Sequence, residues 1–224
     1  MTSLHDSSEI NNNDNFINGW FIEDINLCDQ IINWFESSDC KKFEGLVYEK
    51  DKQVVDKNKK ESIEAALQTN SNLLEKYFYN LNKIMRLYVE KYDYAKKNFN
   101  FGIREIVKVQ RYLPNQGFKV WHSEKSTDTH DRYLVYMTFL NDVTDEGEIE
   151  FFYQKLKIKP KKGFTLIWPA DWTHTHRGVV SKTETKYIVT GWFNYMIPNI
   201  NIDNTNIEEK NLDYSHKKDN FNWQ

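Results

Sequence analysis

The sequence predicts a mainly β domain, an antiparallel barrel or jelly roll, preceded by N-terminal helices. From residue 101 onward, short runs rich in β-branched and aromatic residues follow one another, separated by turn-like clusters. No helical pattern of ~10–15 residues lies between these runs, so antiparallel strands are favoured over a parallel βαβ sheet. Before residue 100, apolar residues instead recur at spacings of three and four, as they do on one face of a helix.

The chain of 224 residues has a length that suits one domain, and its 15% aromatic content is too high for a disordered polypeptide. We expect a flexible N-terminus over 1–15, a single domain over 16–196 and a polar C-terminal tail over 197–224. Within the domain, 16–100 would give helical support and 101–196 the jelly-roll core. The net charge of −3 does not favour a nucleic-acid partner.

The cellular setting follows from features that the sequence lacks. It has only two cysteines, no basic and apolar leader at its N-terminus, and no run approaching the ~20 apolar residues that span a bilayer. We therefore expect a cytoplasmic protein with no membrane partner. The sequence does not determine the oligomeric state.

The helices are expected in two places. The segment 25–35 has its apolar residues on one helical stripe, and the segment from Ile63 to about Lys96 predicts one long helix or a helical pair. A charge-rich connection over 50–61 separates them. The expected strands are 105–112, 132–140, 148–158, 163–169 and 186–195.

Two segments that follow predicted strands carry candidate metal ligands. His122 and Glu124 are two residues apart, and in an extended backbone such residues point to the same side. A third ligand would come from His174 or His176, which alternation alone does not separate. Two His and one carboxylate form the facial triad of non-haem iron(II), although zinc accepts the same ligands.

Lys186 opens the last apolar strand, ten positions after His176. A buried cation requires an anionic partner. Bound 2-oxoglutarate would provide one, because it chelates iron at one end and leaves a second carboxylate deeper in the pocket. Alternation places Lys186, Ile188, Thr190 and Trp192 on one face of the strand, which we interpret as the pocket face, with Thr190 and Trp192 as further cofactor contacts.

The segments VQRYLPNQGFKVWHSE, RYLVYMTFLNDVTDEGEIEF, KIKPKKGFTLIWP and HRGVVSKTETKY resemble the prolyl-4-hydroxylase-like branch of the iron(II)/2-oxoglutarate dioxygenases, including phage-encoded members. The resemblance covers about 90 residues, from Ile106 to Phe193. It implies a double-stranded β-helix (jelly-roll) core. It also implies an enzyme that uses Fe(II), 2-oxoglutarate and O2, with ascorbate as a candidate reductant, and couples oxidative decarboxylation of 2-oxoglutarate to hydroxylation of a C–H bond.

The resemblance also assigns roles to individual residues. Tyr112 would donate a hydrogen bond to 2-oxoglutarate, and the spacing to Lys186 favours His176 over His174 as the distal ligand. Two positions depart from the usual pattern: Glu124 replaces an Asp, and Glu148 stands where many members have Gly. The second departure weakens any transfer of prolyl specificity, so the expected substrate is a peptidyl (prolyl-like) or an amino-acid-like molecule.

Two alternatives to the dioxygenase follow from the same residues. One is a zinc hydrolase that uses the same His/Glu/His ligands, for which a deep cation such as Lys186 has no purpose. The other is a non-catalytic jelly-roll binding module. Near the ligands, Arg132 and Arg177 are candidate contacts for an anionic substrate. Trp121, Trp168 and Trp172 could line a cleft, although core packing is the commoner role of such residues.

Overall fold

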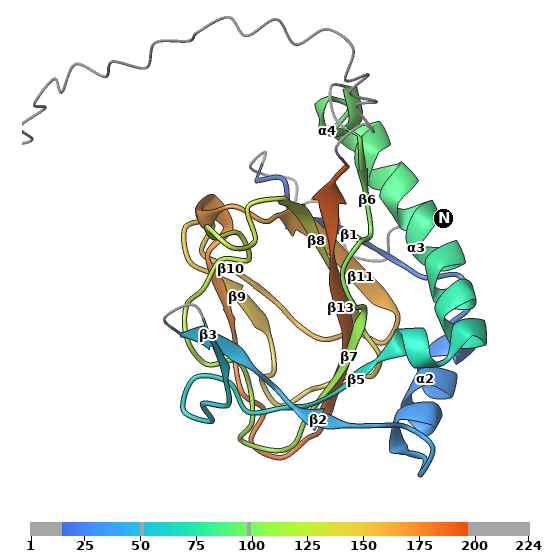
Figure 1. Ribbon diagram of the computed structural model, residues 1–224, viewed down its shortest axis with the longest axis vertical. Helices are drawn as coiled ribbons and strands as arrows, with labels where there is room; N and C mark the ends of the chain where they lie inside the picture. The colour runs from blue at the N-terminus through green and yellow to red at the C-terminus, as the bar shows by residue number, and fades with distance from the viewer. Residues whose placement is uncertain (1–14, 50–51, 98–99, 197–224) are drawn as a thin grey trace, which may run out of the picture.

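The central strands bury side chains on both of their faces, and this places them between two layers. The structure is a computed structural model that describes residues 15–49, 52–97 and 100–196. A large antiparallel sheet is covered by helices on one side and lies opposite a smaller sheet on the other (Figure 1). The predictions for the N-terminal 1–14 and for the tail 197–224 lie outside the described residues.

The large sheet has the strand order β1-β11-β8-β13-β7-β5-β2, with β6 also paired to β13. Its strands are β1 (Asn18–Phe21), β2 (Phe43–Glu44), β5 (Ile63–Ala66), β6 (Phe101–Gly102), β7 (Lys108–Tyr112), β8 (Arg132–Phe139), β11 (Phe164–Pro169) and β13 (Lys186–Tyr195). The smaller sheet has the order β10-β9-β12, from β9 (Ile149–Phe151), β10 (Leu156–Ile158) and β12 (His176–Gly178). A separate pair joins β3 (Val47–Glu49) to β4 (Lys52–Val54).

Alternation along β8 and β13 divides the core into two parts. Tyr136 and Val189 belong to the part beneath the helices, whereas Val135 and Ile188 belong to the part that also contains side chains of β9 and β10. The second part is the interior between the two sheets. This arrangement confirms the predicted mainly β, jelly-roll fold.

The first predicted helix is α2 (Asn26–Glu36), which buries Leu27, Cys28, Ile31 and Phe35 as its apolar stripe indicates. The second is α3 (Ser71–Lys91), followed by the short α4 (Tyr94–Lys97). Figure 1 shows α2 and α3 on the same side of the large sheet. Short 3-10 turns occupy Leu67–Thr69 and Trp172–His174.

The prediction of helix from Ile63 onward was wrong for its first residues. Ile63–Ala66 is strand β5, which pairs with β7, and α3 begins only after Asn70, whose side chain accepts a hydrogen bond from the Leu73 backbone N–H at 3.2 Å. That hydrogen bond is an N-cap, and it fixes where the helix starts. The apolar spacing continues across this boundary because both elements bury residues in the same core.

The N-terminal hundred residues are also less helical than predicted. They supply β1 to one edge of the large sheet and β5 with β2 to the other, and β3 pairs with β4 where an irregular connection was expected. These strands have two to four residues each, too short to show alternation. Their backbone pairing with β11 and β7 is a tertiary interaction.

Three further features complete the fold. The run expected over 148–158 is divided into β9 and β10 by a tight turn in which Lys155 has a φ of 50°. Strand β12, which was not predicted, pairs with β9. Among the described residues, no helix is both long and apolar enough to cross a membrane.

Candidate metal centre

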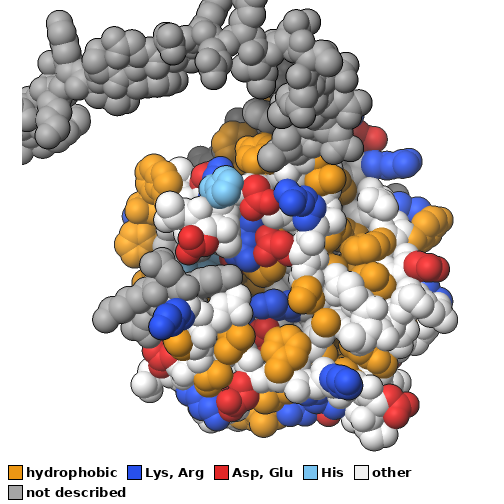
Figure 2. Space-filling view, viewed as in Figure 1, with side chains coloured by type: hydrophobic (Ala, Val, Ile, Leu, Met, Phe, Trp, Pro, Cys, Tyr) orange, Lys and Arg blue, Asp and Glu red, His pale blue; other side chains and the backbone are white. Residues whose placement is uncertain are grey.

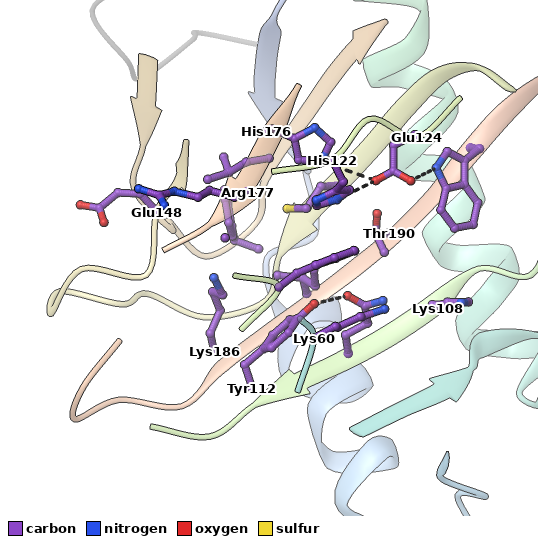
Figure 3. A pocket seen from close by; sticks show the side chains of 18 residues that line it. Lys60, Lys108, Tyr112, His122, Glu124, Glu148, His176, Arg177, Lys186 and Thr190 are labelled. Carbon is purple, nitrogen blue, oxygen red and sulfur yellow. Dashed lines mark hydrogen bonds and ion pairs between the residues drawn. The ribbon is translucent and has the colours of Figure 1, made fainter. Parts of the chain in front are cut away.

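Three predicted ligands, from segments far apart in the sequence, converge in the interior between the two sheets. Glu124 Oε1 lies 3.6 Å from His122 Nε2 and 3.4 Å from His176 Nε2. One ligand atom from each residue fits within 4.8 Å of the others. Figure 3 shows the two imidazole rings and the carboxylate pointing toward one another.

The backbone holds the two histidines side by side. The His122 N–H donates to the His176 carbonyl at 3.0 Å, and the His176 N–H donates to the His122 carbonyl at 2.9 Å. His176 also begins β12, whose pairing with β9 fixes it against the smaller sheet. Residues 54 positions apart in the sequence are therefore set by one reciprocal pair of backbone hydrogen bonds.

Hydrogen bonds also determine which ring nitrogen of each histidine is free. His122 Nδ1 lies 3.0 Å from the Val120 carbonyl oxygen, and His176 Nδ1 lies 3.0 Å from the His174 carbonyl oxygen. A carbonyl only accepts, so each Nδ1 carries the proton and donates it. Each Nε2 faces the Glu124 carboxylate, and in a neutral imidazole with its proton on Nδ1 the Nε2 lone pair is free to bind a metal.

The second oxygen of Glu124 is held from the opposite side. The indole Nε1–H of Trp192 donates to Oε2 at 3.1 Å, and Arg132 Nη1 lies 3.4 Å from the same oxygen. Arg132 stacks over the Trp192 ring, with its Cζ 3.5 Å from the ring centroid, and forms a forked ion pair with Glu105. These contacts leave Oε1 directed at the histidines.

The protonation states suit metal binding. Burial and the neighbouring His176 lower the pKa of the His122 ring, which keeps it neutral near pH 7. Burial alone would raise the pKa of the Glu124 carboxyl group, but the adjacent His122 and His176 rings outweigh it and hold that pKa well below its usual range. The site therefore places an ionised carboxylate beside the His122 ring, whose neutral form is favoured.

Lys186 lies in the same cavity, away from the three ligands (Figure 3). Its Nζ donates to the Gly147 carbonyl at 2.8 Å, and the residue is 7% exposed. Burial lowers the pKa of this ammonium group from 10.5 to about 8. An ammonium group has three donors, and within the described part of the chain only one of them has a hydrogen-bond acceptor. The remaining donors suit a carboxylate ligand.

The other predicted cofactor contacts also line the cavity, and each has a protein partner in this structure. The Tyr112 hydroxyl donates to Gln110 Oε1 at 2.6 Å, and the Tyr112 ring centroid is 5.3 Å from Lys186 Nζ. The Thr190 hydroxyl donates to the Tyr136 carbonyl at 3.0 Å. Contacts of Tyr112, Thr190 and Trp192 with 2-oxoglutarate remain predictions.

His174 lies apart from the three-residue cluster. Its Nε2 is 2.8 Å from the Asn15 carbonyl oxygen and its Nδ1 is 2.9 Å from the Thr173 hydroxyl, so both ring nitrogens are engaged. Of the tryptophans near the ligands, Trp168 is fully buried, whereas Trp121 and Trp172 are 37% and 64% exposed.

Sequence reasoning missed several residues of this cavity. Arg132 was expected to contact an anionic substrate, but it contacts Glu124 and Glu105 instead. Lys60 and Lys108 line the cavity as well, and neither was singled out. Lys60 lies in a charged connection that resembles a solvated loop, so nothing in the sequence indicated its burial. Lys108 could have been indicated only by an alternating pattern along β7.

Comparison with known proteins gives a family match over the strands that hold this site. Residues 107–194 match the profile of the 2OG-Fe(II) oxygenase superfamily. These residues match as a 2OG-Fe(II) oxygenase domain. The match confirms the resemblance found in the sequence, and it favours the dioxygenase over the zinc hydrolase and the non-catalytic module. No curated protein resembles the oxygenase closely enough in sequence to count as a relative.

Solved structures with the same fold include several prolyl hydroxylases. A prolyl hydroxylase from Trichoplax adhaerens, in complex with a hypoxia inducible factor peptide fragment, has a TM-score of 0.65 and 15% identity, covering 84% of this chain and 86% of its own. A prolyl-4-hydroxylase from Pseudomonas putida has a TM-score of 0.60 and 12% identity, with coverages of 82% and 95%. The viral collagen prolyl hydroxylase of Paramecium bursaria Chlorella virus-1, as its 2OG complex, has a TM-score of 0.54 and 18% identity, with coverages of 81% and 97%.

The cofactors of this oxygenase are those of the superfamily, iron(II), 2-oxoglutarate and dioxygen. The residues present fit them. The cluster of two imidazole nitrogens and one carboxylate oxygen is the donor set of a facial triad, and the spare donors of Lys186 suit the distal carboxylate of 2-oxoglutarate.

Proposed function

We propose that His122, Glu124 and His176 bind the iron, that Lys186 binds the distal carboxylate of 2-oxoglutarate, and that the oxygenase hydroxylates a C–H bond of a peptidyl (prolyl-like) or amino-acid-like substrate. The observation that carries this proposal is the convergence of the three ligand atoms in the cavity that also contains the Lys186 ammonium group.

Bound iron(II) and 2-oxoglutarate supply dioxygen activation coupled to the release of CO2 and succinate. The protein positions the participants. The carbonyls of Val120 and His174 hold the two imidazole rings with Nε2 facing the iron site. The Trp192 indole keeps one oxygen of Glu124 occupied, so the carboxylate offers a single oxygen to the metal.

Lys186 orients 2-oxoglutarate. Because the ammonium group is buried, its attraction to a carboxylate is screened much less than it would be in water. One end of 2-oxoglutarate would be held at Lys186 and the other would chelate the iron.

The substrate class is supported by likeness of fold. The Trichoplax neighbour is in complex with a peptide fragment, and the Pseudomonas and viral neighbours are also prolyl hydroxylases. A peptidyl or amino-acid-like substrate is therefore the natural first candidate for this chain. We also propose a cytoplasmic location, which the two free, buried cysteines, Cys28 and Cys40, support.

The experiment is an anaerobic titration of the protein with iron(II) and 2-oxoglutarate, followed by admission of O2 and measurement of succinate. Wild-type protein should form the iron–2-oxoglutarate charge-transfer absorption band and release succinate, and Glu124→Ala should do neither. His130→Ala is the matched control, because His130 is an exposed histidine whose Nδ1 lies 3.1 Å from the Thr127 carbonyl. Iron-dependent turnover that persists in Glu124→Ala contradicts the ligand assignment.

A further inference from the structure

A second cationic group, distinct from Lys186, lies in the same cavity. Lys60 Nζ is 2.5 Å from Glu64 Oε1, and Lys108 Nζ is 3.4 Å from Glu64 Oε2. Glu64 is fully buried, Lys60 is 5% exposed, and Lys108 is partly buried. Two ammonium groups thus share one carboxylate, which leaves one positive charge in excess. We call Lys60 and Lys108 the lysine pair.

Glu64 carries a single negative charge, and most of its contacts are made by one of its two oxygens. Its Oε1 already accepts hydrogen bonds from the Ser62 hydroxyl and the Gln110 amide, in addition to the contact with Lys60. Its Oε2 is buried and accepts no hydrogen bond within the described part of the chain. Burial also lowers the pKa of Lys60 despite the adjacent Glu64. An excess charge in such a place is costly until an anion binds.

The strand register separates this group from Lys186. In the pairing of β7 with β13, Lys186 lies opposite Tyr112 and Thr190 lies opposite Lys108. Four residues along a strand correspond to about 13 Å. A five-carbon diacid such as 2-oxoglutarate spans only about 5 Å between its end carbons, at ~1.5 Å per C–C bond. One molecule of 2-oxoglutarate is therefore much shorter than the backbone separation between Lys186 and Lys108.

The lysine pair and Lys186 line one cavity together with the iron ligands. Figure 3 shows Lys186 and Lys108 well apart in this view, with Lys60 labelled between them and Glu124 above. Aromatic rings flank the lysine pair: Phe118 lies 5.3 Å from Lys60 Nζ and Trp192 lies 6.0 Å from Lys108 Nζ. Figure 2 shows basic and acidic side chains close together at the centre of this face of the molecule. An anion at the lysine pair would sit next to both an apolar wall and the iron site.

We propose that Lys60 and Lys108 bind a free carboxylate of the substrate, so that the substrate is an amino acid or the C-terminal residue of a peptide and not an internal peptide segment. This inference rests on the function proposed above, which it narrows. A single excess positive charge matches a carboxylate. A phosphate group carries close to two negative charges at pH 7, which one excess positive charge does not balance.

The test uses the anaerobic complex of the full chain with iron(II) and 2-oxoglutarate. The probes are the twenty common L-amino acids as free acids and the same compounds as carboxamides. At least one free acid should perturb the absorption band and, after O2 is admitted, accelerate succinate release. Its carboxamide should bind roughly 10- to 100-fold more weakly, as expected for the loss of a charge-assisted hydrogen bond.

Variants separate a binding role from a structural one. Lys108→Met should abolish the preference for acid over carboxamide, whereas Lys108→Arg should keep part of it because the charge persists. Lys119→Met is the matched control, because Lys119 is 38% exposed, pairs loosely with Glu61 at 3.9 Å, and does not line the cavity. The thermal midpoint of each variant shows whether it is folded.

Each outcome is decisive. Absence of the absorption band in the wild-type protein contradicts the proposed function itself. If the band forms, three results overturn the carboxylate site alone. They are a panel in which no free acid perturbs the band, equal binding of acid and carboxamide, and an acid preference that Lys108→Met retains to the same degree as Lys119→Met.

Discussion

Replacement of Lys186 by Met should have opposite effects on stability and on co-substrate binding. Lys186→Met keeps an unbranched side chain of similar length but removes the charge. In the protein without 2-oxoglutarate, the ammonium group is buried beside the Gly147 carbonyl and has a pKa of about 8 in place of 10.5. Its charged form therefore destabilises the cofactor-free fold.

The structure gives the size and the pH dependence of this effect. The difference between a pKa of 10.5 and one of about 8 corresponds to roughly 3 kcal/mol. The Gly147 carbonyl loses a donor in the variant, which costs about 1 kcal/mol, so the net gain is ~2 kcal/mol near pH 7. The unfolded chain keeps the proton to higher pH than the folded one, so wild-type stability rises as pH increases from 8 to 10.5. The advantage of the variant should shrink over that interval.

Urea unfolding at several pH values measures the first effect, and titration of 2-oxoglutarate into the iron-loaded protein measures the second. Removal of one partner of a buried charge pair costs roughly 3–5 kcal/mol, so Lys186→Met should bind 2-oxoglutarate on the order of 10²–10³-fold more weakly. Lys186→Arg should be affected less, since it keeps the charge. A variant that is less stable than the wild type and binds 2-oxoglutarate equally well would refute the reasoning.

Three further predictions concern the metal centre. His122→Ala should remain folded, as judged by circular dichroism, and should lose iron binding in calorimetry; retained iron affinity would contradict its assignment. Trp192→Phe removes the N–H that holds Glu124 Oε2. Iron should then bind about 1–2 kcal/mol more weakly, consistent with the loss of one hydrogen bond to a charged group. The absorption spectrum of bound Co(II) should also change, because the second oxygen of Glu124 is released, and an identical spectrum would argue against this role of Trp192. His176→Ala should lose iron, whereas His174→Ala should keep iron and the uncoupled decarboxylation of 2-oxoglutarate; the reverse result would transfer the ligand role to His174.

The sequence predicted those elements whose side chains alternate or repeat over many residues. Strands β8 and β13 have eight and ten residues, and the apolar stripe of α2 runs through eleven. Each of these patterns is long enough to show its period. By contrast, β5 has four residues and β12 three. Their identity depends on the strand they pair with, which no local pattern records.

The convergence of the candidate iron ligands could be predicted in part, for a related reason. His122 and Glu124 are neighbours on one extended segment, so their common direction is a local property. The local sequence does not decide between His174 and His176 as the third ligand, because both side chains lie on the same side of an extended chain. In the structure, the reciprocal backbone pairing of His176 with His122 brings that ring to the cluster, while the ring of His174 contacts the Asn15 carbonyl.

By itself, the sequence predicted the mainly β class and the kind of chemistry, and it offered Lys186 as the cation for 2-oxoglutarate, since these rest on strand patterns and short motifs. Only the tertiary structure decided that Arg132 contacts Glu124, and that Lys60 and Lys108 meet at Glu64. The partners in these contacts come from different strands and loops. Their proximity follows from how the two sheets pack and in which register, and burial then gives each charge an effect that its position in the sequence does not reveal.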